Sequence, residues 1–126
     1  MFEIPDVMRM AQAMARHSGA RHVVIAENIA QADTPGYRAR DLPDFAASYH
    51  ASGGLTATRP THLDADKAQL ALRAGIDRTT PSLSPNGNSV SIEHEMMRAA
   101  QNVQSHELAL AIYGSARTVL RAALGR

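Results

Sequence analysis

The sequence has 126 residues, which is enough for one domain. Its 13 basic and 12 acidic residues give a formal net charge of +1 without a basic stripe, which argues against nucleic-acid binding. It contains no Cys, so neither a disulfide framework nor a thiolate metal site is available. Trp is absent and aromatic residues are few, while Ala and Met supply much of the apolar content. This composition favours close helix–helix contact over a thick core.

The first six residues carry neither the basic region nor the apolar stretch of a cleaved signal peptide. No apolar run approaches the roughly 20 residues that a membrane-spanning helix needs. The sequence therefore predicts a chain that does not span a membrane. It also predicts a cytoplasmic location, unless the chain is exported by a route that uses no cleaved signal.

The first predicted element is a long helix over residues 5–33. Pro5 suits the first turn of a helix, because its missing N–H would have no partner there. Apolar or small residues then recur at gaps of three or four, apart from one place where His22 occupies the expected site, and this pattern is a heptad-like seam. The seam comprises Ile4, Met8, Ala11, Ala15, Ser18, Ile25, Ile29 and Ala32. A second apolar row comprises Val7, Met10, Met14 and Val24.

A helix stop and chain reversal is predicted at Thr34-Pro35-Gly36-Tyr37. The residue before a proline is biased away from the helical region, which ends the helix before Pro35. Pro-Gly suits the two central positions of a type II turn, where Gly supplies the positive φ. The segment after this turn, within residues 34–88, is predicted to be irregular, with a candidate strand at 55–58 and a candidate helical piece at 65–74.

The last predicted element is a helix within residues 89–125. Ser91 is a good N-cap, and Glu93 and Glu95 follow in the first turn, where the helix dipole favours negative charge. Gly125 is predicted to end the helix. One apolar row comprises Ile92, Met96, Ala99, Val103, Leu110, Tyr113, Leu120 and Leu124, and a second comprises Leu108, Ile112, Ala116, Val119 and Ala123.

These elements predict a mainly α fold, in which two long terminal helices pack as a coiled-coil-like hairpin beside an irregular middle segment with a short β element. Each helix then buries one stripe and leaves a second apolar row for other chains. The predicted subunit-interface residues are Ile4, Met8, Ala11, Ala15, Ile25, Ile29, Ile92, Met96, Ala99, Val103, Leu110, Tyr113, Leu120 and Leu124. The alternative is a monomeric bundle, with a third helix from the middle segment.

Motifs for catalysis or metal binding are not apparent. The six His residues form no His-Glu-x-x-His pattern, and neither a Gly-x-Ser-x-Gly elbow nor a phosphate loop is present. Asp64 and Asp66 lie in a polar stretch typical of a solvated face. We therefore expect no enzyme activity and no catalytic, cofactor-binding or metal-binding residues.

Residues 25–41 read Ile-Ala-Glu-Asn-Ile-Ala-Gln-Ala-Asp-Thr-Pro-Gly-Tyr-Arg-Ala-Arg-Asp. This stretch resembles the signature of bacterial flagellar rod and hook proteins, in which a helix end is followed by Asn/Asp-Thr-Pro-Gly-Tyr and a basic residue. Residues 58–63 and the run Asn86-Gly87-Asn88-Ser89-Val90 also resemble this family, as does the acidic helix start that follows. The family turn motif is carried here by Asn28, Asp33, Thr34, Pro35, Gly36 and Tyr37.

The resemblance implies a structural subunit of the proximal rod, which polymerises through its terminal helices and links the motor and export apparatus to the distal rod and hook. It implies flagellar type III export without a cleaved signal, and a place in the periplasmic basal body. It also implies terminal helices that are poorly ordered when free. The implied partners are other copies of the chain, FlgC-type and distal rod proteins, the base adaptor FliE and the export gate, without nucleic acid or a small-molecule substrate.

Two other functions remain open from the sequence. A soluble helical adaptor or export chaperone of a secretion system would form a small closed complex, and would not need the Thr34–Tyr37 turn. A cell-wall hydrolase would need a cleft with paired carboxylates, and the sequence offers no such pair.

Overall fold

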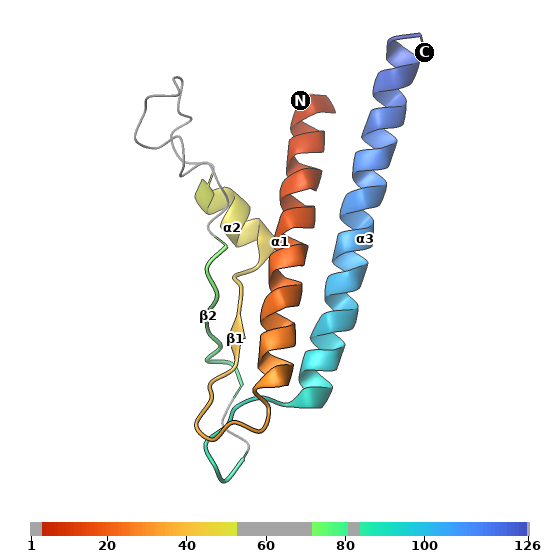
Figure 1. Ribbon diagram of the computed structural model, residues 1–126. Coiled ribbons are helices and arrows are strands. Elements are labelled where there is room, and N and C mark those ends of the chain that lie inside the picture. Colours follow the sequence, from red (N-terminus) through yellow and green to blue (C-terminus); the bar gives the residue numbers. More distant parts are fainter. Residues whose placement is uncertain (1–3, 53–71, 81–83, 126) are drawn as a thin grey trace.

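The computed structural model describes residues 4–52, 72–80 and 84–125. Two long helices, α1 (Ile4–Ala30) and α3 (Ile92–Ala123), run antiparallel side by side as a hairpin (Figure 1). At 1.5 Å per residue they are roughly 40 and 48 Å long. We call the end where α1 stops and α3 starts the closed end, and the end with the two chain termini the open end. The predicted hairpin of long terminal helices is confirmed.

Helix α1 ends a few residues before the predicted position, because residues 31–34 already form turns. The Gln31 N–H donates to the Glu27 carbonyl, and the Thr34 N–H donates to the Gln31 carbonyl, at 3.0 Å each. Gly36 then adopts a φ of 72°, and the Tyr37 N–H donates to the Thr34 carbonyl at 3.3 Å. The predicted reversal at this Pro-Gly pair is confirmed.

Helix α3 begins and ends as its sequence indicates. Ser91 is the N-cap, and its hydroxyl accepts a hydrogen bond from the His94 N–H at 3.4 Å. Glu93 and Glu95 lie in the first turn, at the positive end of the helix dipole. At the other end Gly125 has a φ of 71°, which an L side chain rarely adopts.

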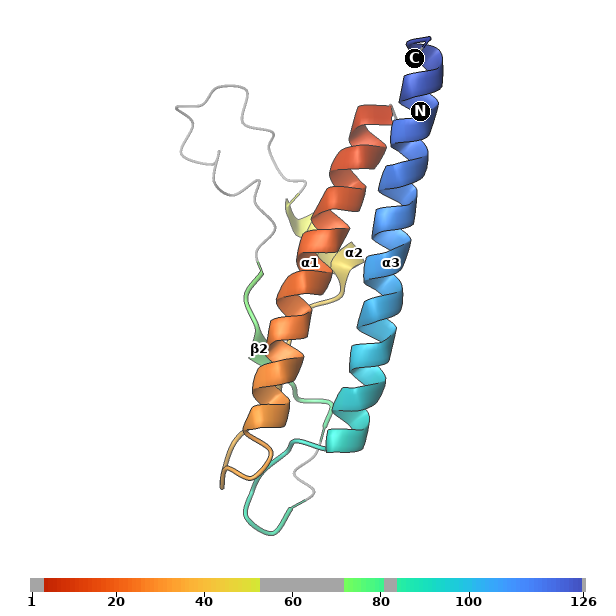
Figure 2. The same ribbon diagram turned by 45° about the vertical axis from the view of Figure 1, so that its right-hand side comes forward.

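The middle segment lies against the side of α1 (Figures 1 and 2). Strands β1 (Arg40–Asp41) and β2 (Gly75–Ile76) pair antiparallel, with Arg40 opposite Ile76, which confirms the expected short β element. Helix α2 (Phe45–Ser52) was not predicted. The candidate strand at 55–58 lies outside the described residues, as does most of the candidate helix at 65–74. Residues 72–74 are not helical.

The core of the described chain is small. Its buried hydrophobic residues are Ala11, Val24, Ile25, Ala39, Leu42, Val90 and Ala109. The buried polar or charged residues are more numerous: His17, Ser18, Asn28, Ser48, Asn88, Ser89, Glu95, Arg98 and Asn102. In this described part, none of the helices combines the length and the apolar content needed to cross a membrane.

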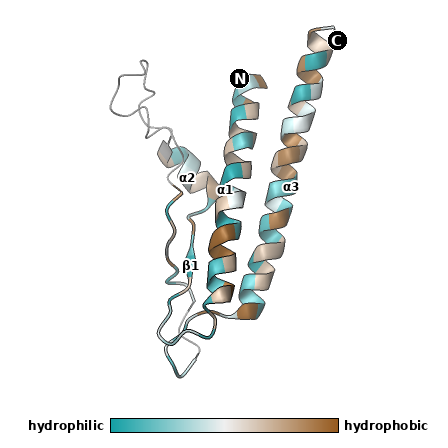
Figure 3. Ribbon diagram, viewed as in Figure 1, coloured by the Kyte–Doolittle hydropathy of each residue, from teal (hydrophilic) through white to brown (hydrophobic). Residues whose placement is uncertain are grey.

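The buried stripe of α3 is polar near the closed end. Glu95, Arg98 and Asn102 face α1 near the closed end, and Ala109 continues the same face. The residues expected to form an apolar seam are mostly exposed, with Met96 63% and Leu110 54% exposed. Helical turns that carry hydrophobic residues recur along α3, including the part that extends past the start of α1 (Figure 3). The polar residues of α3 face inward because hydrogen-bonding partners on α1 and the middle segment offset the cost of burying them.

Candidate functional site at the closed end of the hairpin

The two motifs that resemble rod proteins lie against each other at the closed end. The Gly36 N–H donates to the Asn86 carbonyl at 2.9 Å, and the Ser89 N–H donates to the Tyr37 carbonyl at 3.0 Å. Gly87 has a φ of 81°, and a Cβ built on it would lie 3.7 Å from the Cα of Gly36. The turn after α1 and the turn before α3 are therefore packed backbone to backbone.

Asn88 caps the end of α1 from 54 to 57 residues away in the sequence. Its Nδ2 donates to the carbonyls of Gln31, Ala32 and Thr34 at 2.9, 2.8 and 2.8 Å. Its Oδ1 accepts from the Val90 N–H at 2.8 Å, and the side chain is fully buried. Carbonyls at a helix end need such partners, because they have none within the helix. The start of α3 thus completes the end of α1.

Asn28 is the corresponding residue on α1. Its Nδ2 donates to the Arg40 carbonyl at 2.7 Å and to Glu95 Oε2 at 3.2 Å. Its Oδ1 accepts from the Arg40 N–H at 3.0 Å and from the Tyr37 hydroxyl at 3.2 Å. One amide therefore joins α1, the turn, β1 and α3, and both ends of that amide are satisfied.

The charged residues at the closed end form one connected cluster. Arg98 of α3 donates to Asp77, which follows β2, and to Glu95 Oε1 at 3.3 Å. It also lies 3.8 Å from Asp41 of β1. Asp41 in turn receives two hydrogen bonds from Arg21 of α1, at 2.9 and 2.8 Å. This ionic cluster (Arg21, Asp41, Asp77, Glu95 and Arg98) ties both strands to both long helices.

The environment of the cluster shifts two of its pKa values. The hydrogen bonds that Arg21 donates to Asp41 raise the pKa of Arg21 against the effect of burial. Burial alone would raise the pKa of Asp77, but hydrogen bonds from Thr79, Arg98 and Thr80 outweigh it and hold that pKa well below its ordinary value of 3.8. Both residues therefore stay charged at neutral pH.

Tyr37 and Ser89 fix the turn to the sheet. Burial raises the pKa of the Tyr37 phenol, which remains protonated and donates to Asn28. The Ser89 hydroxyl accepts from the Ala39 N–H at 2.8 Å, and the Asp77 N–H donates to the Ala39 carbonyl at 2.9 Å. The backbone of the residue before β1 is thus held by residues from distant segments.

The predicted turn residues do not all have the same environment. Asn28 is buried and Tyr37 is half-buried, and these two meet. The other four, Asp33, Thr34, Pro35 and Gly36, are exposed. The ionic cluster was not singled out as a site, because charged residues in a helical pattern usually form a solvated face. The signal available in the sequence was the spacing of Glu95, Arg98 and Asn102, which places them on one helix face.

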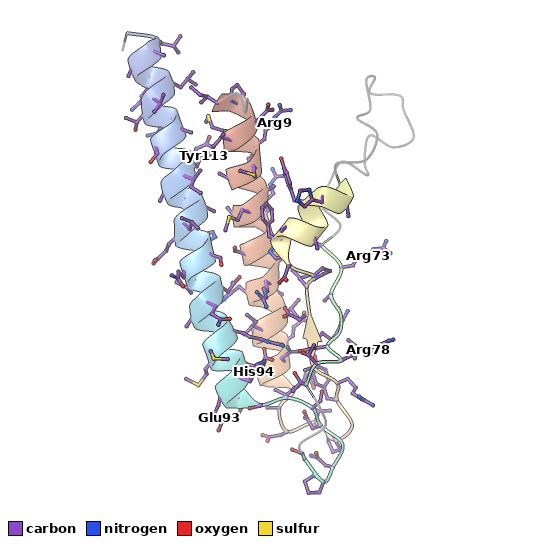
Figure 4. The ribbon with its side chains drawn as sticks, turned by 180° about the vertical axis from the view of Figure 1, so that it is seen from behind. Arg9, Arg73, Arg78, Glu93, His94 and Tyr113 are labelled. Carbon is purple, nitrogen blue, oxygen red and sulfur yellow. The ribbon has the colours of Figure 1, made fainter. Side chains whose placement is uncertain are left out.

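The predicted interface residues divide between the two helices. On α1, Ala11 and Ile25 are buried within the chain, Ile4, Met8 and Ala15 are half-buried, and Ile29 is exposed. On α3 the members at least partly covered are Ala99 and Leu120. The remaining ones, all exposed, are Ile92, Met96, Val103, Leu110, Tyr113 and Leu124. Tyr113 and Arg9 lie near the open end, whereas Glu93 and His94 lie at the closed end (Figure 4).

The polar groups at the closed end hold segments of the chain together. Every buried side-chain nitrogen or oxygen in the described part of the chain has a hydrogen-bond partner. Among the described residues, no group of three or more His, Asp or Glu is placed to hold a metal ion. His17 bonds to the Pro43 carbonyl at 2.7 Å and packs edge-on against Phe45, which fixes α2 to α1. The polar side chains thus bind one another.

Comparison with known proteins agrees with the two motifs that meet here. The chain is 31% identical over 118 residues to flagellar basal body rod protein FlgB of Salmonella typhimurium, covering 86% of this chain and 85% of the relative. It is 35% identical over 105 residues to FlgB of Cereibacter sphaeroides, with 81% and 80% covered. The chain belongs to the FlgB family. FlgB of Escherichia coli K12 is 30% identical over 118 residues, with 86% and 85% covered.

No family model matches the chain. The matches to FlgB proteins nevertheless extend over most of its length. The family resemblance seen in the sequence is therefore confirmed. The contacts of Asn28 with Glu95, and of Asn88 with the end of α1, hold the hairpin of this FlgB-family chain closed.

Proposed function

We propose that this chain is a structural subunit of the flagellar basal-body rod and polymerises through the exposed faces of its two long helices. The observation that carries the proposal is the inverted polarity of α3. Near the closed end polar side chains fill its contact with α1, while most of its large hydrophobic side chains are exposed. These are Ile92, Met96, Met97, Val103, Leu108, Leu110, Tyr113 and Val119. Burying a fully exposed Leu or Val contributes about 1.5–3 kcal/mol, so covering each of these half-exposed side chains contributes about half as much and favours association.

The open end offers a second surface of the same kind. A groove of about 380 Å³ lies between α1 and α3 there. Its lining is almost entirely apolar: Ile4, Val7, Ala111, Ile112, Ser115, Ala116 and Val119. The groove opens between the helices at the open end, whereas Met96 and Val103 of the exposed α3 face lie outside it. Contacts between two different surfaces of a chain are heterologous, and they produce a helical filament when the rotation between neighbouring subunits does not close into a ring.

The family relationship supports the remaining parts of the proposal. The relatives are named flagellar basal body rod proteins, and we propose that this chain occupies the proximal part of the rod, in the periplasm. Its proposed neighbours are further copies, FlgC-type and distal rod proteins, the adaptor FliE and the export gate. The proposed route is type III export without a cleaved signal. We propose no catalytic step, since the buried polar groups described above are engaged with one another.

The test is a charge placed on the exposed face of α3. Val103→Lys and Leu110→Lys, alone and combined, are expected to leave the helix content of the isolated chain unchanged, because both side chains are already exposed. In a host that lacks its own FlgB, the double variant is expected to abolish swimming in soft agar and to yield no rods in purified basal bodies. The matched control is Gln104→Lys, at an exposed polar position of the same helix.

Two results would contradict the proposal. One is a double variant that builds rods and swims as well as the Gln104→Lys control. The other is a purified wild-type chain that forms a small closed complex at every concentration and never a filament, as measured by light scattering. The second result would favour the soluble adaptor or export chaperone.

A further inference from the structure

The two-stranded sheet pairs on one side of β2 only, in the part of the chain that the structure describes. In an antiparallel pair of strands, every second pair of residues points its backbone N–H and carbonyl groups away from the partner strand. The Asp77 N–H donates to the Ala39 carbonyl at 2.9 Å, so these two form a hydrogen-bonded pair. The next pair is Arg40 with Ile76, and Arg40 turns its N–H and carbonyl to the Asn28 side chain, away from β2. The N–H and carbonyl of Ile76 therefore point outward, at the outer edge of β2.

This outer edge of β2 is accessible. Strand β1 lies between β2 and α1, so the outer edge faces away from the hairpin (Figure 1). Among the described residues none bonds to the N–H or carbonyl of Ile76, which is 60% exposed. A Cβ added to Gly75 would meet no atom of the described chain within 4 Å, apart from its own neighbours. Another backbone has room to approach here, and a free strand edge is a template for pairing with one.

Arginines flank the outer edge. Arg73 precedes β2 by two residues and Arg78 follows it by two, and both are exposed. Their side chains project away from the two long helices (Figure 4). Within the described ranges neither arginine forms an ion pair, because Asp41 and Asp77 are already paired with arginines of α1 and α3. The outer edge therefore carries a positive charge that the described part of the chain does not balance.

A hollow of about 370 Å³ adjoins the same edge. Its lining includes Arg73, Ile76 and Arg78, so it can hold a side chain of a segment that lies along β2. Guanidinium groups bind carboxylates through paired, planar hydrogen bonds, which are roughly twice as strong as bonds between neutral groups. The carboxylates of Asp41 and Asp77 also line the hollow, but their arginine partners offset their charge. An acidic side chain therefore fits the hollow.

We propose that the outer edge of β2 binds an extended, acidic segment of a different protein, which adds a third strand to the sheet. Backbone hydrogen bonds at Ile76 hold the segment, and Arg73 and Arg78 select its charge. Nucleic acid and anionic lipid offer charge but no strand to pair with β2, so a protein segment fits both features. A second copy of this edge is disfavoured, because pairing would bring like charges together. The site is separate from the helix faces through which the chain is proposed to polymerise.

The test is binding of a short fluorescent peptide of alternating Glu and Val to the full-length chain, measured by fluorescence anisotropy. We expect binding that weakens as salt is added. A Lys–Val peptide reverses the charge, and a Glu–Val peptide with methylated backbone nitrogens keeps the charge but cannot donate backbone hydrogen bonds. Both are expected to bind at least about tenfold more weakly. Absence of binding by the Glu–Val peptide would overturn the proposal, as would equal binding of either control peptide or preferred binding of phosphatidylserine vesicles.

A pair of variants at one position tests the backbone pairing. Ile76→Pro removes the outward N–H, and the ladder between β1 and β2 does not use that N–H, so the sheet is expected to persist. Ile76→Ala is the matched control, because it also shortens the side chain but keeps the N–H. The Pro variant is expected to bind the Glu–Val peptide about 3- to 10-fold more weakly than the Ala variant. Equal affinities would show that no strand is added at Ile76.

Charge reversal tests the selection by the two arginines. Arg73→Glu combined with Arg78→Glu changes two exposed positions, and is expected to weaken Glu–Val binding at least about tenfold and to strengthen Lys–Val binding. Arg117→Glu, at an exposed position of α3, is the control and is expected to change neither. Wild-type affinity in the reversed variant would contradict the proposal. Val103→Lys with Leu110→Lys, which tests polymerisation, is expected to leave peptide binding unchanged, so the two proposals can fail separately.

Discussion

At the closed end of the hairpin the buried side chains are mostly polar and fully partnered, whereas at the open end the exposed side chains are mostly apolar and line a groove. The two ends therefore differ in the kind of interaction that their side chains can make. Hydrogen bonds and ion pairs depend on direction, so the contacts of Asn28 and Arg98 select one arrangement of strands and helices. Apolar burial is not directional, so a partner that covers the open end, as proposed above, would gain affinity there without fixing the fold of this chain.

The largest expected effect comes from the ionic cluster. Arg98→Leu leaves the carboxylates of Asp77 and Glu95 without their cation, and a broken buried ion pair costs about 3–5 kcal/mol. We expect the urea midpoint to fall accordingly. Arg117→Leu, at an exposed position of the same helix, is the control and is expected to change stability by less than about 0.5 kcal/mol. Equal effects of the two substitutions would show that the closed end is not held by its charges.

The next effect tests the buried amide. Asn28→Asp has nearly the same shape, but it places an oxygen against the Arg40 carbonyl and Glu95 instead of a donor. We expect a loss of about 2–3 kcal/mol in the free energy of unfolding. Asn86→Asp is the matched control, because Asn86 is exposed and only its acceptor atom is used, for the Asn88 N–H. A small effect at both positions would show that the Asn28 amide does not hold the closed end together.

The pH dependence of stability follows from Asp77. Its folded pKa is lowered, so its contribution is fully present above the unfolded value of 3.8 and is lost as pH falls below that value. Chemical unfolding measured between pH 6 and about 3 is expected to show falling stability in the acid range. Asp77→Asn should give a flatter curve. Identical slopes for the variant and the wild type would exclude Asp77 as a source of the acid sensitivity.

The smallest effects are expected at two glycines and have opposite signs. Gly36→Ala strains a backbone with a φ of 72°, at a cost of about 1–2 kcal/mol. Gly19→Ala in α1 has open space around it and should stabilise the helix by about 1 kcal/mol. Thermal unfolding midpoints measure both. A stabilising Gly36→Ala would mean that the turn after α1 does not need its left-handed residue.

Local signals allowed much of this fold to be predicted. The Pro35-Gly36 turn, the Ser91 cap and Gly125 each act through their own backbone or the next few residues, so the sequence alone reveals them. Helix α2 was missed because it is short and its residues show almost no amphipathic pattern. A weak signal was present: Asp44 is a residue type that favours helix starts, and its carbonyl accepts from the Ser48 N–H at 3.0 Å.

The closed end could not be predicted in the same way. Glu95, Arg98 and Asn102 resemble a solvated stripe, and their burial depends on partners from other segments. The local sequence does not indicate that Asp77 pairs with Arg98, or that the Ser18 carbonyl accepts a hydrogen bond from Asn102 Nδ2. Periodicity identified which apolar residues share a face of α3, but it did not identify the polar residues that contact α1.

The cap that Asn88 places on α1 also bears on how the chain can vary in length. Because the two partners are far apart in the sequence, closing this contact requires the intervening chain to form a long loop. The entropic cost of closure grows only slowly, by about 0.6 kcal/mol for each doubling of loop length. Inserting a peptide between α2 and β2 should therefore change the stability of the hairpin very little. The closed end can act as a fixed frame on which segments of very different size are carried.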